Sequence, residues 1–131
     1  MIRPTGRTSA VFSGTGPSQR LVGYIDSMRG VFDLHHGYLG SASGVERDGA
    51  YTIRSVRGGG MVVGYVEAKP SAANGGWWHQ VYDASHNLVG LVGNDGEMET
   101  PSGGQIGVIV YSAAAVRHGW RSAASALRLL F

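Results

Sequence analysis

One short phrase recurs five times along the chain and constrains the fold more than any other feature. Each copy has two residues, usually apolar, then a glycine, then two further residues that are mostly apolar. The five glycines are Gly23, Gly40, Gly64, Gly90 and Gly107. An internal repeat is the signature of a fold built from several similar supersecondary units. The repeat therefore predicts a scaffold, and it leaves few residues to be explained by chemistry.

Each glycine phrase is followed by a turn and a second short strand, so a unit reads as a β-hairpin. Two of the turns contain Asp48-Gly49 and Asp95-Gly96, and Asp-Gly between extended segments is a strong hairpin signal. Side chains alternate between faces along a strand, so the second strands should carry one core set and one surface set. The expected core set is Phe32, Tyr51, Tyr82 and Met98, and the expected surface or rim set is Asp33, Thr52, Asp83 and Glu99.

Glycine persists within a strand where another backbone or a large side chain approaches closely. Glycines in register across several hairpins indicate strands that crowd a central axis, with aromatic side chains of neighbouring units covering the glycines. We expect an all-β fold in which four pseudo-repeated hairpins form a closed, flower-like or barrel-like antiparallel arrangement, with little or no helix.

The units carry three shared motifs: the phrase Val22-Gly23-Tyr24-Ile25, an Asp-Gly turn, and the return Val81-Tyr82-Asp83. In these motifs, over roughly residues 20–112, the chain resembles the four-fold beta-flower domain, a small bacterial family. The insertion at 55–60 and the long linker at 68–78 depart from exact four-fold symmetry. The resemblance implies a fold, and it implies no established chemistry or catalytic residues.

The chain has the length of one ordinary domain, with 131 residues and 43% hydrophobic content. We expect residues 1–19 to form an N-terminal arm or an edge strand centred on Ala10-Val11-Phe12. Residues 20–131 should form a single β-repeat domain with a C-terminal closing segment. Gly119 and the preceding strand at 106–111 favour a turn there, and we expect a final strand after it that closes the sheet. The helical alternative rests on a stripe of Val116, Trp120, Ala124, Leu127 and Phe131.

Composition narrows the function classes. Cysteine is absent, which excludes disulfides, thiolate metal sites and cysteine nucleophiles. The net charge is only +2 and the arginines are scattered, so nucleic-acid binding is not expected. No apolar run is long enough for a membrane span, and the N-terminal residues lack the apolar block of a secretory signal. We expect a soluble, cytoplasmic protein without a cofactor.

Two histidines occupy matched turns and are candidates for binding. They occur as Asp33-x-x-His36-Gly37 and Asp83-x-x-His86-Asn87. One interpretation is a turn in which the aspartate accepts backbone hydrogen bonds, Gly37 or Asn87 is left-handed, and the histidine points outward. The other brings both histidines to one end, with His35 or His79, where imidazoles and carboxylates could hold a divalent metal.

Trp77 and Trp78 form the densest aromatic group. In a strand one of them would enter the core, and we expect Trp78 to pack beside a repeated glycine. Alternatively the pair is an exposed anchor for a protein partner or ligand, because tryptophan is enriched at binding hot spots.

The chain offers no convergent set of catalytic groups. Ser85 is adjacent to His86 and near Asp83, but neighbours within one tight turn do not reach the geometry of a hydrolase triad. We therefore expect a noncatalytic module with a structural or protein-interaction role, and self-association is compatible with it. The alternative is a ligand- or metal-binding domain that uses the turns of His36 and His86 and the Trp77-Trp78 segment.

Overall fold

The computed structural model describes residues 9–26, 30–45, 50–56, 59–67, 71–73, 76–93, 96–110 and 120–131. The strands in these ranges are β1 Ser9–Ser13, β2 Arg20–Ile25, β3 Gly30–Phe32, β4 Tyr38–Val45, β5 Ala50–Ser55, β6 Met61–Glu67, β7 Ser71–Ala73, β8 Gly76–Asp83, β9 Leu88–Gly93, β10 Glu97–Glu99 and β11 Gln105–Val110. The helices in these ranges are the short 3-10 helix η1 Gly16–Ser18 and the α-helix α1 Trp120–Leu130.

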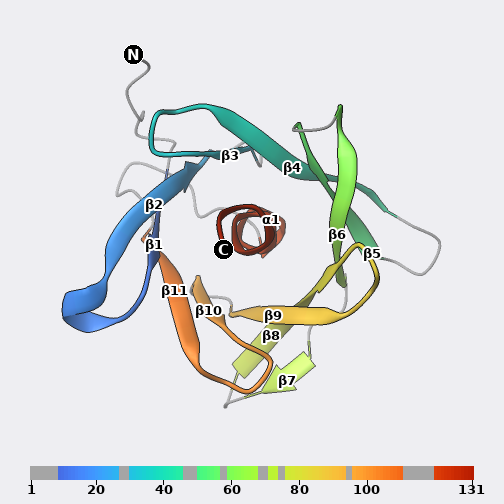
Figure 1. Ribbon diagram of the computed structural model, residues 1–131. Helices are drawn as coiled ribbons and strands as arrows, with labels where there is room; N and C mark the ends of the chain where they lie inside the picture. The colour runs from blue at the N-terminus through green and yellow to red at the C-terminus, as the bar shows by residue number, and fades with distance from the viewer. Residues whose placement is uncertain are drawn as a thin grey trace.

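The strands form a closed antiparallel barrel, which confirms the expected all-β closed arrangement. In sheet order they run β6-β5-β4-β3-β2-β1-β11-β10-β9-β8, and β6 pairs with β8 to close a ring of ten strands. Viewed along its axis, the ring surrounds the C-terminal helix (Figure 1). The remaining strand, β7, pairs with β8.

The barrel contains five similar units where the sequence predicts four hairpins. Each unit joins a glycine strand to the second strand beside it, in the pairs β2/β3, β4/β5, β6/β8, β9/β10 and β11/β1. The fifth glycine phrase, around Gly107, takes its second strand from the N-terminal side of the chain. Ala10 of β1 is opposite Val110 of β11, and β1 also pairs with β2. The strand expected around residues 10–12 therefore exists, and it is an inner strand of the ring instead of an edge.

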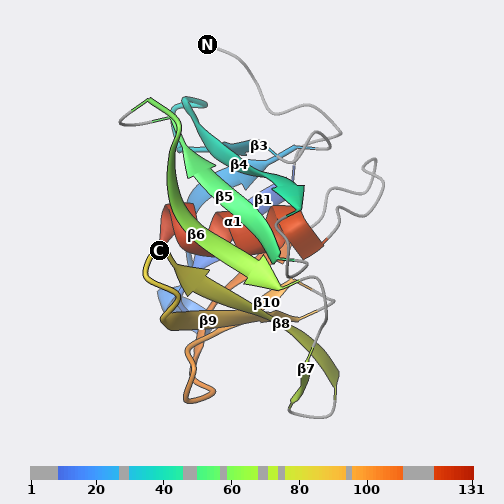
Figure 2. The same cartoon turned by 90° about the vertical axis from the view of Figure 1, so that its right-hand side faces the viewer.

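The C-terminus forms a helix, so the expectation of a final closing strand is wrong. Helix α1 runs along the bore of the barrel, as the views along and across the axis both show (Figures 1 and 2). Its central residues are all buried: Ala123, Ala124, Ser125, Ala126 and Leu127. The helix is amphipathic in sequence, but the ring places wall on every side of its central residues. The small side chains let the wall approach closely.

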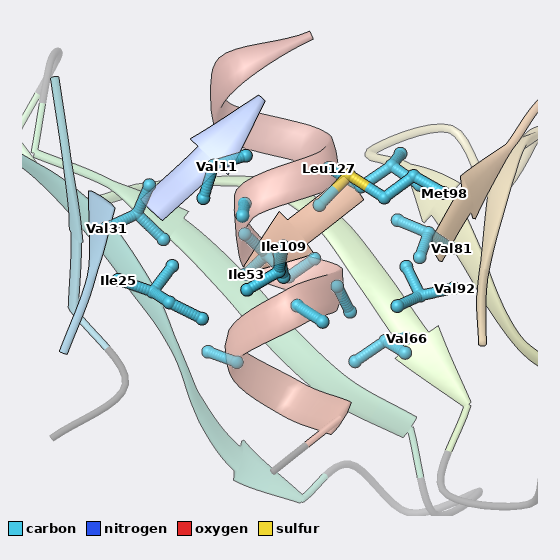
Figure 3. Packing of buried hydrophobic residues seen from close by; sticks show 14 residues of the cluster. Val11, Ile25, Val31, Ile53, Val66, Val81, Val92, Met98, Ile109 and Leu127 are labelled. Carbon is cyan, nitrogen blue, oxygen red and sulfur yellow. The ribbon is translucent and has the colours of Figure 1, made fainter. Parts of the chain in front are cut away.

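Two layers of apolar side chains from the wall pack around α1. One layer comes from the second residue after each repeated glycine: Ile25, Ala42, Val66, Val92 and Ile109. The other comes from the second strands: Val11, Val31, Ile53, Val81 and Met98. Figure 3 shows these side chains surrounding the helix beside Leu127.

The second layer corrects the expected alignment of the second strands. Met98 is buried as predicted, but Phe32 and Tyr82 are only partly buried, and the fully buried residues at that level are Val31 and Val81. A shift of one residue in a strand exchanges its faces. The β-branched valines, rather than the aromatic residues after them, mark the inner positions of these two strands.

The repeated glycines form a further layer, at the level where α1 ends. A side chain at each glycine would meet the carbonyl oxygen of the neighbouring second strand and also a side chain from the end of α1 or from the residue after it. These contacts are Leu130 at Gly23, Leu129 at Gly40, Arg128 at Gly64, Leu127 at Gly90 and Phe131 at Gly107. Five successive residues thus face the five units, one each. The expected crowding is present, and the neighbouring strand backbone and the C-terminal segment supply it instead of aromatic residues from neighbouring units.

Candidate functional site at the barrel mouth

We call one end of the barrel the mouth: the end that holds the connections β1–β2, β3–β4, β5–β6, β8–β9 and β10–β11. Successive strands are antiparallel, so these connections share one end of the ring. Helix α1 ends at the same level, since Arg128, Leu129 and Leu130 line a hollow together with Asp33. Each unit places a polar residue where its second strand ends: Ser13, Asp33, Ser55, Asp83 and Thr100.

The two histidine turns have the expected aspartate hydrogen bonds. Asp33 Oδ1 accepts from the backbone N–H groups of His35 (2.9 Å) and Gly37 (2.8 Å). Asp83 Oδ1 accepts in the same way from Ser85 (2.8 Å) and Asn87 (2.9 Å). These bonds lower the pKa of the Asp83 carboxyl, chiefly through the Asn87 N–H, with smaller contributions from Ser85 and from the charge of Arg128.

The left-handed residue of each turn is the histidine itself, and not Gly37 or Asn87 as expected. His36 has φ of 63° and His86 has φ of 66°. The imidazole of His36 stacks on Tyr24, with ring centroids 4.8 Å apart. The imidazole of His86 stacks on Tyr65 at 4.3 Å. Each tyrosine follows a repeated glycine, so its ring lies on the outer face of the barrel.

A third turn shows what these stacks contribute. Thr100 N–H donates to the Gly104 carbonyl and Gly103 N–H to the Thr100 carbonyl, the same pattern as in the histidine turns. Its left-handed position is Gly103, with φ of 96°, and the residue after the repeated glycine in that unit is Leu91. Histidine therefore takes the left-handed position in the two turns that face a tyrosine. We interpret the ring stack as an offset to the backbone cost of a side chain there.

The mouth contains a hollow of about 380 Å³ between the helix and the wall. Apolar side chains of Leu39, Val63, Leu129 and Leu130 line it, together with the polar groups of Asp33, Ser55 and Arg128. Arg128 is held in place because its Nε donates to the Val63 carbonyl oxygen at 2.6 Å. Sequence reasoning missed this group, since the hollow joins residues 33, 55 and 128 and only the helix in the bore brings the last of them here.

Exposed apolar side chains gather beside this hollow. Tyr38 is also exposed, but its ring lies along the outer wall against Phe32, and its hydroxyl donates to Ser41. We define the rim patch as Leu34, Val56 and Met61, which are 47%, 46% and 58% exposed. They lie on or beside the connections β3–β4 and β5–β6, which adjoin because Val56 N–H donates to the Leu39 carbonyl at 2.9 Å. Phe131, 40% exposed, follows the end of α1 at the same mouth.

The tryptophan segment lies toward the opposite end of the barrel. Trp78 is buried and lies against Gly93, whereas we expected one of the repeated glycines. The side chain of Trp77 is outside the described residues. Since Trp78 and the histidine turns are at opposite ends of β8, they do not contribute to one site.

His79 is buried near Trp78, away from His36 and His86. Burial lowers the pKa of its imidazole, and a hydrogen bond to the Glu67 backbone partly opposes that shift. On the same strand, burial raises the pKa of Tyr82 to about 12, helped by its hydrogen bond to Glu67 at 2.9 Å. Histidines 36 and 86 share the mouth, but the β5–β6 connection separates their turns and each ring stacks on its own tyrosine. Within the described ranges, no three His, Cys, Asp or Glu residues cluster as metal ligands would.

Comparison with protein-family models, with curated proteins and with solved structures finds no match to this chain. In the part of the chain that the structure describes, no helix has the length and apolar character needed to cross a membrane.

Proposed function

We propose that the chain is a small noncatalytic β-repeat module that binds a protein partner through the mouth of its barrel. The observation that carries this proposal is the position of the rim patch. Six large apolar residues are strongly exposed among the described residues, and four of them, the rim patch and Phe131, lie at the mouth. Exposed apolar side chains that gather around a hollow are typical of interaction surfaces.

The interior supports a scaffold role for the barrel. Helix α1 and the apolar layers of the wall fill the bore. The role of the repeated strands is therefore to fix the positions of the connections at the mouth. The resemblance to the four-fold beta-flower family, which implies no catalytic residues, agrees with a noncatalytic module. The ten-stranded ring of five units differs from the four petals of that pattern, and membership of the family stays part of the proposal.

Site-specific photo-crosslinking would test where the partner binds. A benzophenone amino acid is introduced at Met61 in the mouth and, as a matched control, at Val110 at the opposite end. The two positions are equally suitable, because their side chains are 58% and 52% exposed. We expect irradiation in the native cell to give a discrete adduct from position 61, and an adduct of twice the chain mass would identify self-association.

The proposal fails if position 61 gives no adduct, or if positions 61 and 110 give the same adducts. If position 61 does give its own adduct, the partner in it is identified by mass spectrometry and purified, and its binding to the chain is measured by calorimetry. Met61→Ser and Val56→Ser should weaken that binding, because each removes apolar area from the rim patch. Val110→Ser should leave it unchanged.

The second candidate, ligand or metal binding at the histidine turns, has one observation in its favour. Non-glycine residues held at positive φ occur preferentially at functional sites, and both His36 and His86 are such residues. Titration with zinc, followed through the two imidazoles by NMR, would test it. The candidate is rejected if the imidazole resonances stay unchanged at a several-fold excess of metal.

A further inference from the structure

The hollow at the mouth combines an apolar wall with a small number of charged groups. Its volume of about 380 Å³ exceeds the roughly 150 Å³ of an apolar cavity that accepts a benzene molecule. One long side chain and part of its backbone would fit. The wall residues Leu39, Val63 and Leu129 offer contact to the aliphatic part of such a side chain.

Two acidic groups of the mouth offer positions for a cation. Asp33 lines the hollow, and Asp83 lies close enough to Arg128 for the two charges to interact. The last turn of α1 also ends here, and the final carbonyl groups of a helix carry a partial negative charge. The mouth thus holds two carboxylates and a helix C-terminus, with Arg128 beside Asp83.

The pseudo-symmetry of the barrel shows how the mouth already accommodates a basic side chain. Asp33 and Asp83 occupy the same position in the first and third units, with the same backbone hydrogen bonds. At the third unit, Arg128 packs its stem against Gly64 and brings its charge near Asp83. At the first unit the helix contributes Leu130, and Asp33 borders the hollow.

We propose that the hollow receives a lysine or arginine side chain of a protein partner, with its cationic group beside Asp33 and its stem along Leu39 and Leu129. The residues next to this basic side chain in the partner are apolar, because they would contact Leu34, Val56 and Met61 of the rim patch. The inference rests on the proposed function, since it names the chemistry of the partner that binds at the mouth.

Three short peptides test the charge that the hollow selects. The probes are acetyl-Leu-Lys-Leu-amide, its norleucine analogue, which keeps an aliphatic stem without the ammonium group, and its glutamate analogue. Each is titrated into the ¹⁵N-labelled full chain and followed through backbone amide shifts. We expect the lysine peptide to bind about fivefold more tightly than the norleucine peptide, with saturable shifts at Gly37, Leu39 and Ser55.

Two matched variants test the role of Asp33. In Asp33→Asn the side-chain oxygen can still accept from His35 and Gly37, so the turn is kept while the charge is removed. This variant should lower the affinity for the lysine peptide about fivefold and leave the affinity for the norleucine peptide unchanged. Asp83→Asn makes the same change beside Arg128 and should have a smaller effect. Amide spectra of both variants establish that the barrel is folded.

The outcomes separate the inference from the function on which it rests. If the norleucine peptide binds as tightly as the lysine peptide, or the glutamate peptide binds more tightly, the mouth binds apolar or acidic partners and the inference is wrong. The interaction function would stand in that case, provided that Met61→Ser weakens binding. If no peptide gives saturable shifts at the mouth, the inference is also wrong, and the crosslinking at Met61 decides on the function separately.

Discussion

The inner wall of the barrel and the turns at its mouth are built from the same repeat, but they vary in different ways. On the inner wall all five units carry glycine at one level and apolar residues at the next. At the mouth, three turns with the same hydrogen bonds have His36, His86 and Gly103 at the left-handed position. One helix contacts every unit of the wall and imposes the same requirement on each. Among the residues that the structure describes, no single element contacts the outer faces of the turns in this way, so each turn is stabilised by its own neighbours.

The largest expected effect comes from adding a methyl group to the inner wall. In Gly40→Ala the new Cβ would overlap the Arg54 carbonyl oxygen, at a φ of 152° that side chains rarely adopt. We expect the free energy of unfolding to fall by about 3 kcal/mol. At Gly90 the nearest atoms are 2.9 Å away, and one of them belongs to the flexible side chain of Leu127. Gly90→Ala should therefore cost only about 1 kcal/mol.

Urea unfolding of these variants would measure the difference, with Gly104→Ala as the control. Gly104 lies in a mouth turn, and the nearest atom to an added Cβ is 3.4 Å away. This variant should stay within about 0.5 kcal/mol of the parent. Equal unfolding midpoints for Gly40→Ala and Gly104→Ala would show that the inner wall at Gly40 is less crowded than we describe.

An intermediate effect is expected at the histidine turns. Tyr24→Leu removes the ring on which His36 stacks and gives the first unit the leucine found at Leu91 of the fourth. In this variant no ring stack compensates for the backbone cost of a left-handed histidine. The substitution His36→Gly should therefore stabilise the Tyr24→Leu protein. In the parent, His36→Gly should change stability little, because it removes the backbone cost and the stack together.

A double-mutant cycle of Tyr24→Leu and His36→Gly checks this reading. We expect a coupling energy of about 1 kcal/mol, the range for an aromatic pair. A coupling near zero would mean that the two rings are neighbours without stabilising one another, and that the histidine must be kept for another reason.

The smallest expected effect is a pH dependence at the end opposite the mouth. The pKa of His79 is lowered from its ordinary value of 6.5, chiefly by burial. The unfolded chain therefore binds a proton more readily than the folded chain, and protonation favours unfolding. The contribution of His79 to the free energy of unfolding is fully present above pH 6.5. It is lost as the pH falls from there toward the lowered pKa of the folded state.

Thermal unfolding between pH 7.5 and pH 5 would measure this dependence. His79→Gln carries no titrating group at this position and should flatten the profile. If His79→Gln retains the full dependence, another group is responsible.

The sequence predicts the wall much better than it predicts what the wall encloses. The regular glycines and the Asp-Gly turns indicate closed hairpins, because close approach and positive φ are local requirements that glycine meets. Helix α1 is only the alternative in the sequence, because Gly119 favours a turn and nothing local in the sequence shows that the barrel encloses this segment. The fifth unit was missed because pairing β1 with β11 requires residues from both ends of the sequence.

In the candidate site too, features set by residues close in sequence could be predicted, and features set by distant residues could not. The aspartate hydrogen bonds of the histidine turns could be predicted, since they join residues two and four positions apart. The left-handed position could not, because residue preference points to Gly37 and Asn87 and the stack with a tyrosine of another strand overrides it. The hollow at the mouth depends on Arg128, and its place is set only by the helix in the bore.

The position of α1 in the chain has a consequence for how the protein folds. Closing the ring requires Ala10 to pair with Val110, and the helix that fills the bore comes after every strand. Contacts between residues so far apart in the chain slow folding, because the entropy of closing long loops is lost before the contacts form. During synthesis the wall leaves the ribosome before its filling. The apolar inner faces of the described strands therefore stay exposed to water until α1 has been synthesised.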